Sequence, residues 1–112
     1  MTRIELPIKT VAGLNAREHF RGRARRVKAE RTAAYLSVKC AERPFPCVVT
    51  MTRISAGVLD SDNCVGAFKS LRDGIADAYG LADNDPGFTW NYAQEKCARG
   101  KFGVRIEIEA KP

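Results

Sequence analysis

Two stretches near the ends of the chain alternate apolar and polar residues, and this alternation constrains the fold more than any other feature. In 3–11 (RIELPIKTV) and again in 102–110 (FGVRIEIEA), apolar side chains occupy every second position. A period of two predicts β-strands with one buried face. Pro7 cannot donate a ladder hydrogen bond, so the first strand is expected at a sheet edge. Further strands are predicted at 47–56, which is rich in β-branched residues, and at 88–94, where aromatics alternate.

Two longer segments place their apolar residues at helical spacing. The first, 15–41, begins at Asn15, which has an N-cap side chain. The second, 62–79, ends before Gly80, a residue typical of helix C-termini. The element order is therefore β-α-β-α-β-β. It predicts a single α+β domain over 1–112, a mixed sheet with two helices packed on one face.

The chain has no apolar run long enough to span a membrane, and its start lacks the apolar centre of a signal peptide. We therefore expect a cytoplasmic protein. Its four cysteines form no C-x-x-C pair, so free buried thiols are a better interpretation than a zinc site. They are Cys40, Cys47, Cys64 and Cys97.

Positive charge is concentrated in the first part of the chain. Residues 1–45 contain 11 Lys and Arg against 4 Asp and Glu, a net charge of +7, while the whole chain carries +6. Four of these cations share one face of the predicted first helix: Arg17, Arg21, Arg25 and Lys28. Such a row can follow the phosphate backbone of a nucleic acid. The alternative is the solvated face of an amphipathic helix.

Negative charge gathers in 60–85, where six aspartates accompany two cations and give a net charge of −4. Three of them, Asp60, Asp62 and Asp85, are candidate ligands of Mg²⁺, or of Mn²⁺ in its place. Clustered carboxylates repel one another, and a hard divalent cation removes that cost. Such an ion activates water for phosphodiester hydrolysis. Asp83 is a reserve ligand, and the alternative for the whole set is helix capping and turn formation.

A continuous second helix would carry one polar face opposite its apolar stripe. At about 100° per residue, Asp62, Gly66, Lys69 and Asp73 return to that face. Lys69 would then be placed to stabilise charge on a phosphate in the transition state. Asp73 and Asp77 are interpreted as ordinary surface residues.

Four segments carry a resemblance to a known family: LDSDN at 59–63, FKSLRD at 68–73, GIADAYGLADND at 74–85 and LNAREHFRGR at 14–23. They are similar to segments of the RusA-type Holliday-junction resolvases, small endonucleases found in phages and prophages. The resemblance spans most of the chain, and the order of elements agrees with it.

This resemblance implies a metal-dependent endodeoxyribonuclease that cuts branched DNA in recombination and repair. Asp60 and Asp62 match the family's paired metal-binding aspartates, and Asp85 matches its third ligand. Lys69 matches its essential lysine, and Asn15 joins the nucleic-acid-binding residues. The resemblance further implies a homodimer in the cytoplasm of a bacterial or phage-infected cell, with no membrane and no other protein as partner.

Two departures from the family pattern stand out. In better-known members the lysine follows the second aspartate by four residues, but Gly66 holds that place here. Lys69 lies seven residues after Asp62, which moves its ammonium about 4.5 Å along a helix axis. The acidic pair after the helix is split by Asn84. Two other functions therefore stay open, a catalytically inactive DNA-binding module and an assembly protein that binds no nucleic acid.

Aromatic side chains also bear on the expected dimer. Their combined surface is more than two helices can cover, so some of these side chains are expected to face a partner chain. The alternative is that they fill the core under the helices. They are Tyr35, Trp90, Tyr92 and Phe102.

Overall fold

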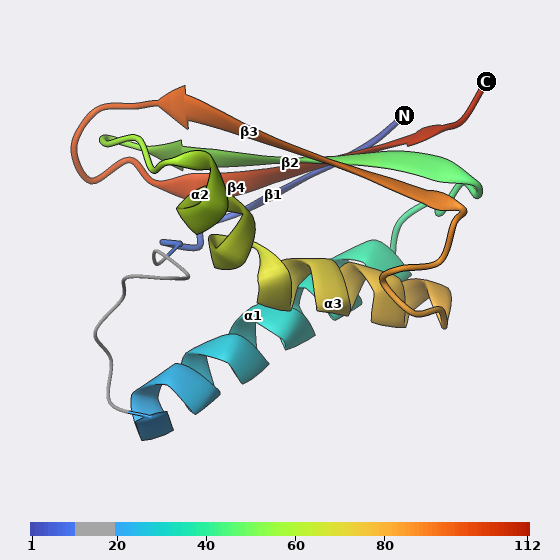
Figure 1. The fold of residues 1–112 in the computed structure, drawn as a ribbon, viewed down its shortest axis with the longest axis horizontal. Helices are drawn as coiled ribbons and strands as arrows, with labels where there is room; N and C mark the ends of the chain where they lie inside the picture. Colours follow the sequence, from blue (N-terminus) through green and yellow to red (C-terminus); the bar gives the residue numbers. More distant parts are fainter. Residues whose placement is uncertain (11–19) are drawn as a thin grey trace.

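A computed structural model of the chain describes residues 1–10 and 20–112. Figure 1 shows one sheet with all the described helices on one of its faces. In chain order the elements are β1 (Thr2–Leu6), α1 (Phe20–Lys39), β2 (Cys47–Ser55), α2 (Ser61–Ala67), α3 (Lys69–Tyr79), β3 (Phe88–Lys96) and β4 (Gly103–Ala110). The predicted α+β architecture is confirmed.

The strands form a mixed sheet in the order β1-β4-β2-β3. β4 pairs antiparallel with both of its neighbours, whereas β2 and β3 are parallel. A parallel pair needs a crossover connection, and α2 with α3 provides it. The turn at 98–101 connects β3 to β4. These two strands do not pair with each other, because β2 lies between them.

The first strand is shorter than its alternation predicts. β1 ends at Leu6, because Pro7 has no N–H for the ladder and Ile8 N donates to Leu6 O at 2.9 Å instead. The edge position expected from Pro7 is confirmed. The predicted first helix, 15–41, is observed as α1 over its described part, which ends at Lys39.

The predicted helix 62–79 is wrong as a single element, because the chain breaks it at Phe68. This residue adopts φ −97° and ψ 0°, and its N–H donates to Val65 O at 3.1 Å in a tightened last turn. Its ring is fully buried and lies 5.9 Å, centroid to centroid, from the ring of Tyr92. Burying this aromatic side chain turns α3 away from the direction of α2. The polar face expected from Asp62 to Asp73 is therefore interrupted.

The core lies between the sheet and the helices. Its largest fully buried side chains include Phe68, Met51, Leu71 and Ile75. Against this core, α1 crosses α3 at very short range, because Gly74 has no side chain. A Cβ built on Gly74 would lie 2.3 Å from the backbone oxygen of Arg31. The close crossing therefore depends on this glycine.

None of the described helices has both the length and the apolar character that a membrane crossing requires. The cysteines partly match expectation. Cys47 and Cys64 are free and buried, and burial raises the pKa of both thiols. Cys40 is also free but exposed, and Cys97 is half-buried.

Candidate functional site

The first candidate carboxylates stand at the start of α2. Asp60 is its N-cap and accepts hydrogen bonds from both nitrogens of Asn63, the backbone N at 2.9 Å and Nδ2 at 3.1 Å. Asn63 is buried, with 6% of its surface exposed, so it holds the Asp60 carboxylate in one orientation. Asp62 follows in the first turn and is exposed. The D-x-D-N motif thus places two carboxylates at one helix end.

The side-chain amide of Gln94 ties this end of α2 to the sheet. Its Oε1 accepts from Leu59 N at 2.8 Å, and its Nε2 donates to Leu59 O at 2.7 Å. Arg53, buried in the neighbouring strand, donates to Gly57 O at 2.8 Å. Asp60 therefore lies beside the C-terminal end of β3.

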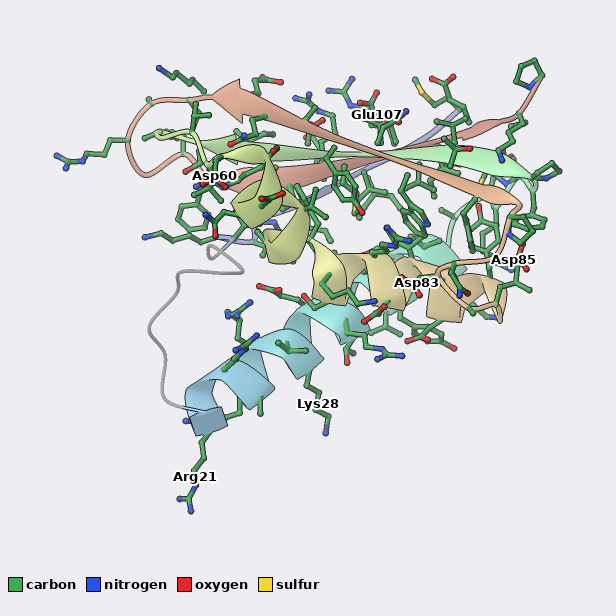
Figure 2. The ribbon with its side chains drawn as sticks, in the orientation of Figure 1. Arg21, Lys28, Asp60, Asp83, Asp85 and Glu107 are labelled. Carbon is green, nitrogen blue, oxygen red and sulfur yellow. The ribbon has the colours of Figure 1, made fainter. Side chains whose placement is uncertain are left out.

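Asp85 lies at the other end of β3. Its Oδ1 accepts from Gly87 N at 2.8 Å, and its backbone O accepts from Phe88 N at 3.0 Å, so it closes the turn that enters β3. Six residues separate Phe88 from Gln94, which is about 20 Å along a strand. Figure 2 shows Asp60 and Asp85 toward opposite ends of the molecule.

Within one chain, the three predicted ligands therefore do not fit a single metal site. Oxygens that bind one Mg²⁺ each lie about 2.1 Å from it, so they cannot be about 20 Å apart. Among residues 1–10 and 20–112, no group of three or more acidic, Cys or His side chains could hold a metal ion. The structure brings Asp60 and Asp62 to one end and leaves Asp85 at the other.

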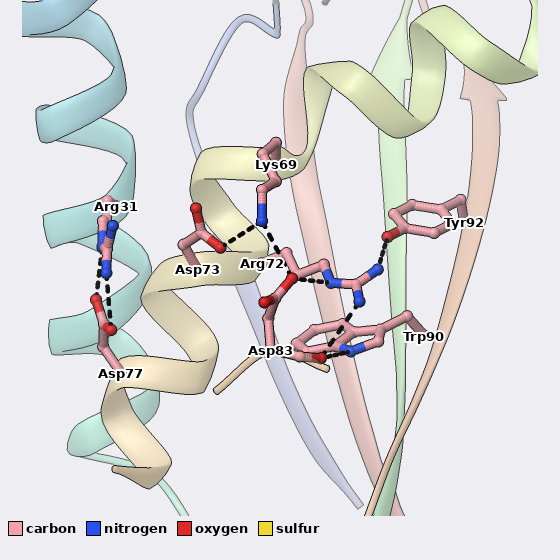
Figure 3. Close-up of polar contacts among 8 residues, drawn as sticks. All are labelled: Arg31, Lys69, Arg72, Asp73, Asp77, Asp83, Trp90 and Tyr92. Carbon is pink, nitrogen blue, oxygen red and sulfur yellow. Dashed lines mark hydrogen bonds and ion pairs between the residues drawn. The ribbon is translucent and has the colours of Figure 1, made fainter. Parts of the chain in front are cut away.

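Lys69, the predicted phosphate partner, lies at the start of α3 and is turned toward Asp73 and Asp83 (Figure 3). Its Nζ donates to Asp73 Oδ1 at 2.9 Å and to Asp83 Oδ2 at 3.1 Å. The hydrogen bond with Asp73 raises the pKa of Lys69, and that with Lys69 lowers the pKa of Asp83. Asp83, the reserve ligand, is thus held by cations of its own chain.

Arg72, which the sequence did not single out, is at the centre of this network. Its guanidinium lies over the Trp90 ring, 4.8 Å from the centroid, and donates to Tyr92 Oη at 2.8 Å. Its Nε forms an ion pair with Asp83 at 2.9 Å, although it is not aligned as a hydrogen bond. Trp90 Nε1 donates to the backbone O of Asp83 at 2.7 Å. Both aromatics are therefore contacted within the chain but stay half-buried. Only the spacing of aromatics along β3 signalled their shared face.

The predicted basic row is present on α1 as far as it is described. Arg21, Arg25 and Lys28 are all exposed, and Figure 2 shows Arg21 and Lys28 pointing away from the body of the protein. Among the described residues, neither Arg25 nor Lys28 has a carboxylate partner. The remaining two members of the set, Asn15 and Arg17, lie outside the described residues.

Other charges of α1 fix it to α3. Arg31 forms a bidentate pair with Asp77, at 2.6 and 3.0 Å, which lowers the pKa of Asp77. Glu30 is 4% exposed and accepts a hydrogen bond from Ser70 Oγ of α3, while Arg26 pairs with it at 3.3 Å. Asp77 therefore does more than solvate the surface, because it anchors the helix that carries the basic row.

Neither the models of known protein families nor the curated proteins include one that matches this chain by sequence. Its function is therefore inferred from its own residues and their arrangement. Two features are chemically distinctive: the exposed basic row of α1, and the carboxylate pair held at the start of α2.

Proposed function

We propose that this protein binds branched DNA and cuts it as a metal-dependent endonuclease, acting as a cytoplasmic homodimer. The observation that carries the proposal is the exposed basic row on α1. The fork of an arginine suits phosphate oxygens, and a row at helical spacing suits a phosphate backbone. Figure 2 shows Arg21 and Asp60 toward the same end of the long axis but on opposite sides of the view, so a strand that runs from α1 to the sheet would reach the carboxylate pair.

The metal site in this proposal needs two chains. Asp60 and Asp62 supply two carboxylates, and about 20 Å separates them from Asp85 of the same chain. A dimer whose two-fold axis is perpendicular to the long axis of the molecule would place opposite ends of the two chains side by side. Asp85 of a second chain would then complete each of two equivalent sites. Two such sites match the two strands that a junction-cutting enzyme must cleave.

The first experiment measures cleavage of a synthetic four-way DNA junction with Mg²⁺ or Mn²⁺. We expect cleavage by the wild type and none by Asp62→Asn or Asp85→Asn. A mixture of these two variants, unfolded and refolded together, separates the possible arrangements. Half of the dimers in this mixture contain one chain of each kind. If each site is shared between chains, such a dimer has one intact site, built from Asp62 of one chain and Asp85 of the other, and one site that lacks both.

The mixture should therefore nick one strand at about a quarter of the wild-type rate per site. If each site is built within one chain, every site in the mixture is defective and no nicking returns. Equal cleavage by the wild type and Asp62→Asn would refute the catalytic proposal. Sedimentation of the wild type gives the oligomeric state independently.

A second candidate function is a DNA-binding module without catalysis. This function is favoured because both acidic residues that follow α3 already have structural roles. Asp83 pairs with Lys69 and Arg72, and Asp85 closes a turn. Such a module binds DNA with the same salt dependence but leaves the junction uncut with either metal. Cleavage decides between the two functions, and binding alone does not.

A further inference from the structure

The cations of the described residues divide into those with partners and those without. Most of the described arginines are held by carboxylates or carbonyl oxygens, as for Arg31, Arg72 and Arg105. Two of the described lysines, Lys69 and Lys111, are held in the same way. In the described part of the chain, the cations without such a partner are Arg23, Arg25, Lys28 and Lys39 on α1, and Lys9, Lys96, Arg99 and Lys101 elsewhere. The second group is not explained by the basic row.

This second group surrounds the loop between β3 and β4. The start of the loop is held to β2, since Cys97 N donates to Ser55 O at 3.1 Å, and a turn closes within it, since Lys101 N donates to Ala98 O at 3.0 Å. Gly100 has φ +82°, a left-handed conformation that suits glycine in a tight turn. Lys96, at the end of β3, and the loop cations Arg99 and Lys101 are therefore displayed on a short segment. We call them, with Lys9 and Phe102, the loop patch.

Phe102 stands among these charges and is 43% exposed. Its ring forms the wall between two surface hollows of about 400 Å³ each. One hollow is lined by Lys9, Arg99 and Cys97, and the other by Leu6 and other apolar residues near the end of β1. Among the described residues that line these hollows, the one carboxylate is Glu5, which is already paired with Arg3 and Arg105.

The loop patch lies at the end of the sheet that carries the carboxylate pair. Gln94 of β3 holds both backbone groups of Leu59, and Lys96 follows it by two residues. Figure 1 shows the β3–β4 loop, the start of α2 and the first turn of α1 all toward the same end of the long axis. A strand gripped by α1 and by the loop patch would pass this end.

We propose that the loop patch is a second nucleic-acid contact, which holds an unpaired segment of the bound DNA. Lys9, Lys96, Arg99 and Lys101 bind its phosphates, and an unstacked base lies on the ring of Phe102. The inference rests on the proposed function and specifies which part of the substrate this end recognises. Cations around a single exposed aromatic ring are the pattern of single-strand binding, because every base offers a face for stacking. A membrane surface would instead require several exposed apolar side chains.

The test compares three fluorescent DNAs: a four-way junction, a single strand and a blunt duplex. Binding anisotropy is measured over a range of salt concentrations. The triple variant Lys96→Gln, Arg99→Gln and Lys101→Gln should lower the slope of log affinity against log salt by about 2 to 3. Lys39→Gln, an exposed cation at the far end of α1, is the matched control and should leave the affinity of every DNA unchanged.

The aromatic contact is tested by Phe102→Ala, which should weaken single-strand and junction binding about tenfold and leave the blunt duplex unaffected. Phe102→Tyr keeps the ring and should restore the affinity. Thermal unfolding of each variant verifies that it is folded. Equal losses on all three DNAs would overturn the stacking role.

Two outcomes separate this inference from the proposed function. If the wild type binds none of the DNAs, or binds vesicles containing phosphatidylserine in their place, both proposals fail. If the wild type binds DNA and only substitution of Arg23, Arg25 and Lys28 weakens it, the loop patch alone is overturned.

Discussion

The close crossing of α1 and α3 makes Gly74→Ala the most informative single substitution for the fold. The new Cβ would lie 2.3 Å from Arg31 O and 2.9 Å from Ala34 Cβ. Carbon atoms pack best about 3.5 Å or more from their neighbours, so the two helices must separate by about 1 Å. A backbone oxygen cannot rotate away, and Ala34 is fully buried.

The cost follows from two opposing effects. Forcing a methyl group into a packed contact costs about 3 kcal/mol at the upper end of the usual range. Replacing glycine by alanine inside a helix returns about 1 kcal/mol. We expect Gly74→Ala to lose about 2 kcal/mol of unfolding free energy, which lowers Tm by about 8 °C in a domain of this size.

Gly22→Ala is the matched control, because it makes the same substitution in α1 at a position with nothing within 4 Å of the new Cβ. It should leave stability unchanged or raise it by up to about 1 kcal/mol. Urea unfolding followed by circular dichroism measures both variants against the wild type. If Gly74→Ala is as stable as Gly22→Ala, the close helix crossing is not present in solution.

Two further predictions concern the aspartates. Asp83→Asn should lower the free energy of unfolding by about 1 kcal/mol at pH 7. This difference from the wild type should vanish as pH falls through the pKa of Asp83, which lies below its ordinary value of about 3.9, because protonation removes the ion pairs from the wild type too. A deficit unchanged at pH 2.5 in acid unfolding contradicts this. Asp60→Ala should lower the free energy of unfolding by about 1 kcal/mol through loss of the α2 cap, whereas Asp62→Ala should lower it by under about 0.5 kcal/mol. Equal urea midpoints for the two variants would contradict the capping role of Asp60.

Periodicity predicted the layers of the fold because it reports which face of an element is buried. Val104, Ile106 and Ile108 are all buried on one side of β4, as their alternation indicated. Periodicity carries no information about which strands pair. The position of β4 comes from pairs that are about 100 positions apart with β1 and about 50 to 60 positions apart with β2. The helix break at Phe68 could not be predicted from periodicity either, because it depends on how the Phe68 ring packs against Tyr92.

The acidic cluster shows a different limit. Asp60 and Asp85 are close in sequence, but α2 and α3 and the run of β3 separate them in space. Composition suggested one acidic patch. In the structure, Asp60 and Asp62 form the carboxylate pair at the start of α2, Asp83 is paired with cations, and Asp85 closes a turn. Lys69 would have faced the pair on an unbroken helix; the turn at Phe68 directs it to Asp73 and Asp83 instead.

The place of β4 has a consequence for how the protein is made. Among the described strands, β1 is synthesised before the other three and pairs with β4 alone, which is synthesised after them. Until β4 arrives, β1 exposes an unpaired edge and β2 lacks one neighbour. Such non-local pairing slows folding and leaves the nascent chain open to aggregation. The sheet therefore closes in a late step that pairs β1 with β4, and chaperones that shield β1 should matter most before that step.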